Sequence, residues 1–432
     1  MTLPVSRRTL LTAGAGAAAG LSMPAAASAV PSASAPSASA STGGKPVAGG
    51  VRFRLDAQTL DGGEQVVSVT LDTSRVGPID PASLATGTFR VHAKAVSPIP
   101  IAPGDQIFSE YDVDRPVTAV RLDEHGDVVL HLSYAEGQLG GGTLGYVVSR
   151  GRNVRLDLTY TITQVSPIAL RDGRTVMFSR FTQGRLVNPE VDRFAYRTSG
   201  SGMKYRLWAA PGHARRDLVV WLHGGGEGGS LPDGYYDNET TLRANRGALG
   251  FVTAQAQAIF GGAHVVAPQS TSFWLEDGDR FAPQIREIIG EVTRGLPVDP
   301  NRIHVVGASN GGYMTLKMTT IYRHLFASSV PICAVVQGLP PGGGPSTITD
   351  AELRAIDTPT WLVASRDDTT VPPGPNTVHA HELIRGSRMS LYDTVTWNGY
   401  RFPGHWSWIY VARNDPSVNG EHLWQWMARR RR

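Results

Sequence analysis

The sequence contains a single cysteine, Cys333, among 432 residues. One cysteine excludes intramolecular disulfides, and the apolar run around it favours a buried strand residue over a nucleophile. Charge of one sign is also scarce. The net charge of +4 falls to +2 without Arg7 and Arg8, and the four arginines at 429–432 exceed that remainder, so the body of the chain is near neutral. Nothing in this balance favours nucleic acid as a partner.

Other absences exclude further classes of protein. No stretch after the N-terminal region has the roughly 18 consecutive apolar residues of a membrane-spanning helix, so no stable membrane anchor is expected. No His-x-x-x-His spacing and no cluster of carboxylates indicates a catalytic metal. The glycine-rich segment Leu222–Gly229 lacks the Gly-Lys-Ser/Thr ending of a phosphate-binding P-loop. Neither a metal nor an organic cofactor is therefore predicted.

The first 50 residues differ in composition from the rest of the chain. Arg7 and Arg8 precede a weakly apolar Ala/Gly run that ends in the Ala-Ser-Ala sequence Ala27–Ala29. A charged start, a short apolar region and a small-residue cleavage site are typical of export signals, and paired arginines resemble the twin-arginine type. We therefore expect a twin-arginine-type signal peptide over residues 1–29 and a disordered linker over 30–49. Secretion through the twin-arginine export machinery follows; an ordinary secretory signal is the alternative.

Residues 50–165 show the alternation of apolar and polar side chains that strands produce. Short runs such as Val66–Leu71, Val117–Leu122 and Val154–Tyr160 are separated by turn residues, and no long amphipathic helix lies between them. Repeated short strands over this length predict a β-sandwich of immunoglobulin type, without the Cys–Trp–Cys core of antibody domains. Residues 166–190 are expected to form a junction.

Strand and helix patterns alternate over residues 191–432. Four short apolar runs suit central parallel strands: Leu218–Leu222, His264–Ala267, Ile303–Val306 and Trp361–Ala364. Helix-compatible stretches lie between these runs. The alternation predicts an α/β domain with a mostly parallel sheet and helices on both faces. In such sheets the functional site lies at the carboxyl ends of the strands.

A Gly-x-Ser-x-Gly pentapeptide, Gly307–Gly311, follows the Ile303–Val306 run and precedes a helix-compatible stretch. Small residues at both ends let the chain turn sharply from strand to helix, and the turn holds the Ser309 hydroxyl clear of its own backbone. With 49 glycines in the chain the pattern alone is weak, so its context must decide. The strand before it and the helix after it predict Ser309 as a nucleophile.

A glycine-rich turn follows the Leu218–Leu222 run. The sequence His223-Gly-Gly-Gly-Glu-Gly-Gly229 exposes backbone N–H groups without side chains in the way, as an oxyanion hole requires. Gly224 and Gly225 are the candidate donors. A flexible or phosphate-cradling loop is the alternative for this segment.

Candidates for an acid and a base come later in the chain. Asp367 and Asp368 follow the Trp361–Ala364 run, and the spacing Asp-x-x-Val-Pro favours Asp368, which leaves Asp367 as a turn or capping residue. A carboxylate there can accept the Nδ1–H of a histidine and fix its tautomer. His405 lies on a turn near the C-terminus, among tryptophans; a packed turn histidine is the alternative.

The chain order Ser309, Asp368, His405 is that of α/β-hydrolases. With these motifs, residues from about 190 to 425 resemble secreted α/β-hydrolase esterases. The nearest groups are the poly(3-hydroxybutyrate) depolymerase and feruloyl esterase relatives, and esterases with an N-terminal immunoglobulin-like domain. The segment Val298–Ile303 and the Trp274 region fit the same pattern. The nucleophile segment also resembles the catalytic domain of the prolyl oligopeptidase family.

The resemblance implies a serine esterase that forms an acyl-enzyme with a small-molecule or polymer ester. His405 would take the Ser309 proton, Asp368 would orient His405, and the N–H of Asn310 would join one from the Gly224–Gly225 turn in the oxyanion hole.

The substrate pocket and the reaction class leave alternatives open. Trp406 and Trp274 are expected either to wall a substrate subsite or to pack at its rim. A serine peptidase of prolyl oligopeptidase type is the alternative enzyme. A catalytically inactive wall- or glycan-binding protein is the alternative from another class.

Overall fold

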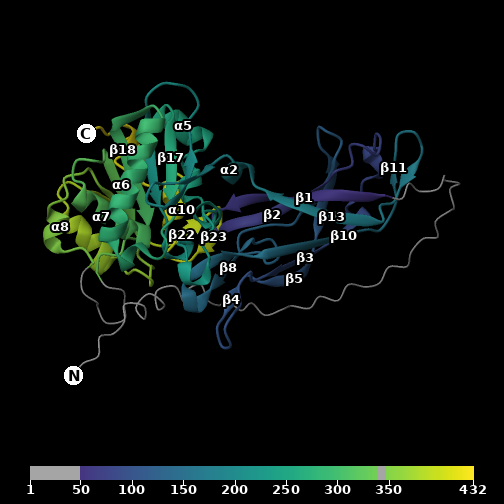
Figure 1. The fold of residues 1–432 in the computed structure, drawn as a ribbon, viewed down its shortest axis with the longest axis horizontal. Helices are drawn as coiled ribbons and strands as arrows, with labels where there is room; N and C mark the ends of the chain where they lie inside the picture. The colour runs from purple at the N-terminus through teal and green to yellow at the C-terminus, as the bar shows by residue number, and fades with distance from the viewer. Residues whose placement is uncertain (1–48, 338–346) are drawn as a thin grey trace.

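The computed structural model describes residues 49–337 and 347–432, which form two units lying next to each other (Figure 1). Residues up to 187 make an all-β unit, and the later residues make an α/β unit. The signal peptide and the linker expected over residues 1–49 lie outside the described residues, apart from Gly49.

The described part of the β unit contains four sheets, and the smallest pairs β11 (Ile168–Ala169) with β12 (Thr175–Val176). The first sheet has the order β13 (Arg180–Val187), β1 (Gly50–Leu60), β2 (Gly63–Leu71), β7 (Val128–Leu132), β6 (Val117–Leu122). The second sheet has the order β10 (Asp157–Gln164), β3 (Phe89–Val96), β5 (Tyr111–Arg115). The third has the order β4 (Ile107–Phe108), β8 (Leu144–Val147), β9 (Arg152–Arg155). Along β1, Val51, Phe53 and Leu55 are buried in the core, whereas Arg52 and Arg54 between them are exposed. This is the two-residue period of a strand with one buried face.

Two segments of the β unit differ from the sequence-based expectation. The segment 166–190, expected as a junction, supplies β13, which pairs in parallel with β1. The run Val154–Tyr160, expected as one strand, divides at Leu156: β9 pairs with β8, and β10 pairs with β3. The Leu156 N–H donates to the Thr143 carbonyl at 2.9 Å where the chain passes from one sheet to the other. Apolar residues alternate through this point without a break, so the pattern could not reveal the change of partner. The immunoglobulin type stays a prediction.

The α/β unit is built on one eight-stranded sheet. Its order is β14 (Ala195–Thr198), β15 (Lys204–Trp208), β17 (Ala263–Pro268), β16 (Arg216–Leu222), β18 (Val298–Ala308), β19 (Ser328–Ile332), β20 (Trp361–Ser365), β21 (Arg388–Tyr392). The six strands from β17 to β21 in this order are parallel, and β14 and β15 are antiparallel to their neighbours. Each of the four apolar runs lies within one of the parallel strands, as predicted.

Helices cover both faces of this sheet. Leu218, Val220 and Leu222 of β16 pack in one core with α6 (Gly278–Gly295) and α7 (Asn310–Ile321). Val219 and Trp221 pack in a second core with α5 (Ala254–Phe260) and α11 (Leu423–Ala428). Residues that alternate between two cores explain why this strand reads as one continuous apolar run. A bilayer crossing would need a longer and more apolar helix than any in residues 49–337 and 347–432.

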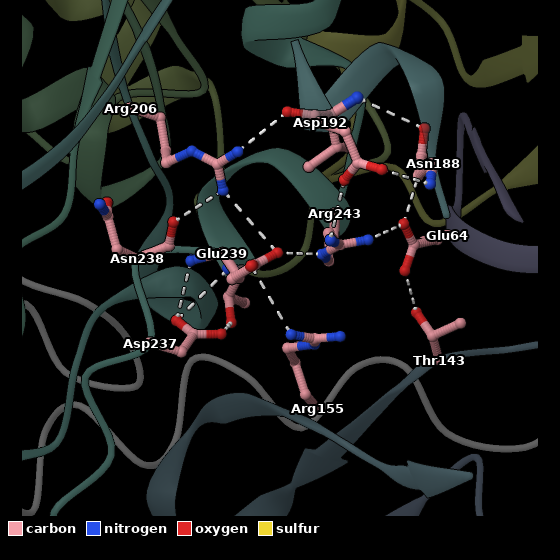
Figure 2. A network of polar contacts seen from close by, with 12 residues as sticks. Glu64, Thr143, Arg155, Asn188, Asp192, Arg206, Asp237, Asn238, Glu239 and Arg243 are labelled. Carbon is pink, nitrogen blue, oxygen red and sulfur yellow. Dashed lines mark hydrogen bonds and ion pairs between the residues drawn. The ribbon is translucent and has the colours of Figure 1, made fainter. Parts of the chain in front are cut away.

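A buried polar network joins the two units (Figure 2). Glu64 of β2 accepts hydrogen bonds from Thr143 Oγ1 at 2.7 Å and from Asn188 Nδ2 at 2.6 Å. It also pairs with Arg243 at the end of α3 (Thr240–Arg243), and Arg243 pairs in turn with Glu239. The Glu64 side chain has no exposed surface.

Further charged contacts cross between the units, among them an ion pair of Arg150 with Asp233 at 2.6 Å. Arg413 donates twice to Asp61, at 2.9 Å each. Arg246 donates to the Thr59 carbonyl at 2.7 Å and pairs with Glu190 at 2.7 and 2.8 Å. Because buried charges are costly unless they are paired and hydrogen-bonded, this set of contacts fixes the β unit in one position on the α/β unit.

Candidate active site

Ser309 stands on a strained turn between β18 and α7. Its backbone has φ 56° and ψ −115°, a conformation that residues other than glycine rarely adopt. Gly307 and Gly311 make the turn possible. A Cβ on Gly307 would lie 2.6 Å from Thr315 Oγ1, and one on Gly311 would lie 2.5 Å from the His223 carbonyl oxygen. The two glycines of the pentapeptide are therefore required by close packing, and the turn has the form expected of a nucleophile elbow.

His405 is held by Asp368. The Nδ1–H of His405 donates to Asp368 Oδ2 at 2.8 Å, and the Asp368 side chain is fully buried. The other carboxylate oxygen of Asp368 accepts from the backbone N–H groups of Thr370 and Val371 at 2.9 and 2.8 Å. These bonds hold the carboxylate in place and direct the Nε2 edge of the imidazole away from it.

The neighbouring Asp367 has another role. It accepts a hydrogen bond from Ser365 Oγ and forms an ion pair with Arg401 at 3.0 Å. Gly404 packs so closely on Asp367 that a Cβ there would collide with it. Asp367 thus braces the turn before His405, and of the two aspartates only Asp368 bonds the imidazole.

Parallel strands bring Ser309 to the same edge as this pair. Ala308 of β18 lies opposite Ile332 of β19, and Ile332 lies opposite Val363 of β20. The Ser309 N–H donates to the Ile332 carbonyl at 2.8 Å. Within the described residues, Ser309 Oγ makes no hydrogen bond to His405. Hydrogen bonds between nucleophile and base are often long in ligand-free enzymes and tighten when substrate binds.

Cys333 is the nearest additional group at this edge. It follows the last residue of β19 with φ 37° and is fully buried. Its sulfur and one ligand atom each of Asp368 and His405 all lie within 4.8 Å of one another. The sequence predicted a buried residue inside a strand; burial is correct, but the residue lies beyond the strand and faces the imidazole. No metal was expected at these residues, and Asp368 and His405 already satisfy each other by hydrogen bonding.

The surroundings of His405 change its basicity. Burial alone would lower the pKa of His405, but the adjacent Cys333 sulfur and the hydrogen-bonded Asp368 carboxylate raise that pKa well above its ordinary value. The neutral imidazole, which is the form that can accept a proton, is therefore populated only toward alkaline pH.

The glycine-rich turn is fixed by His223. The Ser270 N–H donates to His223 Nε2 at 3.0 Å, so the ring proton lies on Nδ1, which donates to the Gly224 carbonyl at 2.6 Å. Burial lowers the pKa of His223 to about 3 and keeps the ring neutral. Trp274 donates through Nε1 to the His223 carbonyl at 3.1 Å.

The turn lies directly against the nucleophile elbow. A Cβ on Gly224 would lie 3.7 Å from the Ala308 carbonyl oxygen, and one on Gly225 would lie 3.6 Å from Asn310 Nδ2. Asn310 is the first residue of α7, where the helix N–H groups have no partner inside the helix. The structure therefore brings the predicted donors at Gly224, Gly225 and Asn310 together beside Ser309.

The two predicted substrate tryptophans have different positions. Trp274 is fully buried and packs on His223 and Phe281. It therefore supports the glycine-rich turn from the core and does not wall a pocket. Trp406 is partly exposed and stacks on Trp408, next to His405 in the chain. Its ring also lies beside Gly62 of the β unit, where a Cβ would be 3.6 Å from Trp406 Cζ3.

The β unit reaches this site through the hairpin of β8 and β9. Asn153 Nδ2 donates to the Gly226 carbonyl at 3.3 Å, and the Tyr146 ring lies beside the same glycine. The Arg152 guanidinium lies over the Phe273 ring, 4.1 Å from its centroid. The glycine-rich turn is thus enclosed by both units.

Sequence reasoning missed two residues at the site, Cys333 and Glu227. Cys333 follows a strand in the same way as Ser309, and that spacing is a signal that could have placed it at the sheet edge. Glu227 lies within the glycine-rich turn itself. An oxyanion hole needs only backbone N–H donors from this turn, so the carboxylate among the glycines is a signal that could have identified Glu227.

Comparison with known proteins supports the fold. No family profile matches this chain. A curated protein described as an esterase, NocK of Nocardia uniformis subsp. tsuyamanensis, is 27% identical over 146 residues, which are 33% of this chain and 41% of that protein. The matched region is less than half the length of that relative.

A solved structure, of a thermostable esterase, covers far more of the chain. It superposes with a TM-score of 0.68 over 88% of this chain and 99% of its own, at 24% identity. The likeness extends over both units and shows that they share the fold of that structure, with the α/β-hydrolase sheet in the second unit.

Proposed function

We propose that this chain is a serine hydrolase that cleaves carboxylic esters through Ser309, His405 and Asp368. The observation that carries the proposal is the 2.8 Å hydrogen bond from His405 to the buried Asp368, at the sheet edge where the strained turn presents Ser309. The likeness to the esterase fold and to the NocK segment supports the same reaction class.

In the first step, His405 removes the hydroxyl proton of Ser309 as the oxygen attacks the ester carbonyl. Asp368 keeps the ring in the Nδ1–H tautomer and offsets the positive charge that forms. The developing oxyanion is held by the N–H groups of Asn310 and Gly225. Loss of one such donor costs about 10²–10³ in kcat in comparable enzymes.

In the second step, His405 returns the proton to the leaving alcohol, and the acyl group stays on Ser309. Water then enters, His405 takes one of its protons, and the resulting hydroxide attacks the acyl-enzyme. The same oxyanion donors serve both steps. As the second tetrahedral intermediate collapses, His405 gives its proton to Ser309 Oγ, which regenerates the hydroxyl and releases the carboxylic acid.

The substrate is proposed to be a small-molecule or polymer ester outside the cell. Trp406, next to His405 and partly exposed, is the candidate wall of the subsite. Export is proposed to use the twin-arginine machinery, because of the paired Arg7 and Arg8. Replacing both arginines with lysine should stop export of the folded enzyme; secretion that continues undiminished would contradict this route.

Ser309→Ala tests the nucleophile directly. The variant should lose nearly all hydrolysis of a short p-nitrophenyl ester and should no longer be labelled by a fluorophosphonate probe, while its circular dichroism stays that of the parent. Ser166→Ala, an exposed serine of the β unit, is the matched control and should keep both activities. Turnover or labelling retained by Ser309→Ala would refute the assignment.

The alternatives can be separated with the parent enzyme. An ester and an anilide with the same acyl group should differ strongly in kcat/KM, in favour of the ester; equal rates would indicate a peptidase. Failure of the parent to react with the fluorophosphonate would indicate an inactive binding protein.

A further inference from the structure

One buried carboxyl next to the site has no part in the proposed mechanism. Glu227 ends the short 3-10 helix Gly225–Glu227 that follows Gly224, and only 9% of its side chain is exposed. Its Oε1 accepts from Asn245 Nδ2 at 3.3 Å, but its Oε2 has no hydrogen-bond partner among the described residues. A buried carboxylate oxygen without a partner is costly, so its retention needs a reason.

The carboxyl lies directly against the glycine-rich turn. A Cβ on Gly224 would lie 3.0 Å from Glu227 Oε2 and 3.7 Å from the Ala308 carbonyl oxygen. Glu227 and the residue before Ser309 are therefore on the same side of this turn. Gln269 holds the other end of the segment, because its Nε2 donates to the Glu227 carbonyl at 3.0 Å.

Four polar groups face the carboxyl from the elements around it. His223, with Nδ1 at 4.0 Å, is neutral, and Asn245 carries no charge. Tyr146, from β8 of the other unit, interacts electrostatically with Glu227, and its own hydroxyl is also buried without a partner in the part of the chain that the structure describes. His405 faces it across the site and acts on it as a positive charge.

The balance of these effects leaves the carboxyl able to ionise near neutral pH. Burial raises the pKa of Glu227 to about 7. The N–H groups of Glu227 and Gly224 and the charge of His405 favour the ionised form and so oppose this rise. Glu227 Oε2 is thus a free acceptor that lies against Gly224, and the proposed mechanism uses the next glycine of the turn, Gly225, as the oxyanion donor.

We propose that Glu227 is a positioning residue of the active site: its free Oε2, which lies against Gly224, accepts the Gly224 N–H when substrate binds and so orients the Gly225 N–H toward Ser309, and its charge faces the His405 imidazolium across the site. The inference rests on the proposed function. Glu227 touches no reacting atom in it; it acts through the turn and through the charge of His405.

The consequence is an acid limb that depends on two groups. As the pH falls, His405 gains a proton and stops acting as a base, and Glu227 gains one and releases the Gly224 N–H. Removing the negative charge of Glu227 also removes a favourable partner of the imidazolium, so the proton on His405 is lost at a lower pH. A purely structural carboxyl would lower activity equally at every pH.

The test compares pH profiles of kcat/KM for the parent, Glu227→Gln and Glu227→Asp with a short p-nitrophenyl ester. Glu227→Gln should lower kcat by roughly 10- to 100-fold with little change in KM. The misplaced donor would weaken binding of the oxyanion, which forms only in the transition state, and would leave substrate binding almost unchanged. Its acid limb should lie at lower pH and fall with a slope of one proton, where the parent falls with a slope approaching two. Glu227→Asp, which keeps the charge, should restore the two-proton limb.

Glu382→Gln, the same exchange at an exposed position on α9 (His379–Leu383), is the matched control and should leave the profile unchanged. A parent-like kcat and acid limb in Glu227→Gln would overturn the inference, as would a uniform loss at all pH values that Glu227→Asp does not relieve. If Glu227→Gln does not fold, the Glu227→Asp profile decides: a single-proton limb there overturns the inference. An inactive parent would instead overturn the proposed function.

Discussion

Replacing Glu64 with glutamine should destabilise the α/β unit, although Glu64 belongs to the β unit. The exchange removes the negative partner of Arg243 and sets an amide NH₂ against donors, since Arg243, Asn188 and Thr143 all donate to this side chain. Removing one partner of a buried ion pair costs about 3–5 kcal/mol. Because Arg243 keeps its contact with Glu239, we expect the lower end, about 3 kcal/mol.

The tryptophans make the assay specific. All nine lie between residues 208 and 426, so fluorescence reports unfolding of the α/β unit alone. With a slope of about 3 kcal/mol per M urea, the midpoint of the fluorescence transition should fall by about 1 M in Glu64→Gln. Glu124→Gln, an exposed turn residue of the same unit, should leave the midpoint unchanged. An unchanged midpoint in Glu64→Gln as well would refute the reasoning, because it would mean that the two units unfold independently.

Three further outcomes follow from the site. Asp368→Asn should lower kcat by about 10⁴-fold while the protein stays folded, since the amide no longer enforces the Nδ1–H tautomer of His405; steady-state kinetics with a p-nitrophenyl ester measures this, and a loss under tenfold would contradict it. Cys333→Ala should move the acid limb of kcat/KM to lower pH, because the sulfur helps to raise the pKa of His405 and the neutral base then appears at lower pH; a limb that stays in place would show that the sulfur does not contribute to this pKa. Gly311→Ala should prevent stable folding, since its Cβ would collide with backbone oxygen, whereas Gly374→Ala, with open space around it, should keep the parent melting temperature; two equally stable variants would contradict the packing argument.

The sequence could predict the features that follow from local pattern. Buried parallel strands read as unbroken apolar runs, and the Gly-x-Ser-x-Gly segment carries its own steric requirement, so β16, β18 and the turn at Ser309 could be placed from residues alone. The choice of Asp368 over Asp367 also followed from spacing, and Asp368 is the one that bonds His405.

Features that depend on contacts far apart in the chain could not be predicted. β13 pairs with β1 across a separation of 130 residues, from Gly50 to Arg180, and nothing in either run specifies the other. Trp274 was expected to wall a substrate subsite or to pack at its rim, but it is fully buried, and its N–H donates to the His223 carbonyl inside the core. Glu227 gains its significance only from Tyr146 and His405, which two distant segments bring to it.

The parallel pairing of β1 with β13 also bears on the order of folding and on where the chain can be divided. β1 is the first described strand to be synthesised, yet one of its edges stays open until residues 180–187 have been made. An open edge with a buried, apolar face is prone to pair with other chains. A fragment ending at residue 165 would carry that edge permanently, whereas one continued through Val187 would close it. The first sheet of the β unit can therefore be completed only after nearly all of that unit has been synthesised.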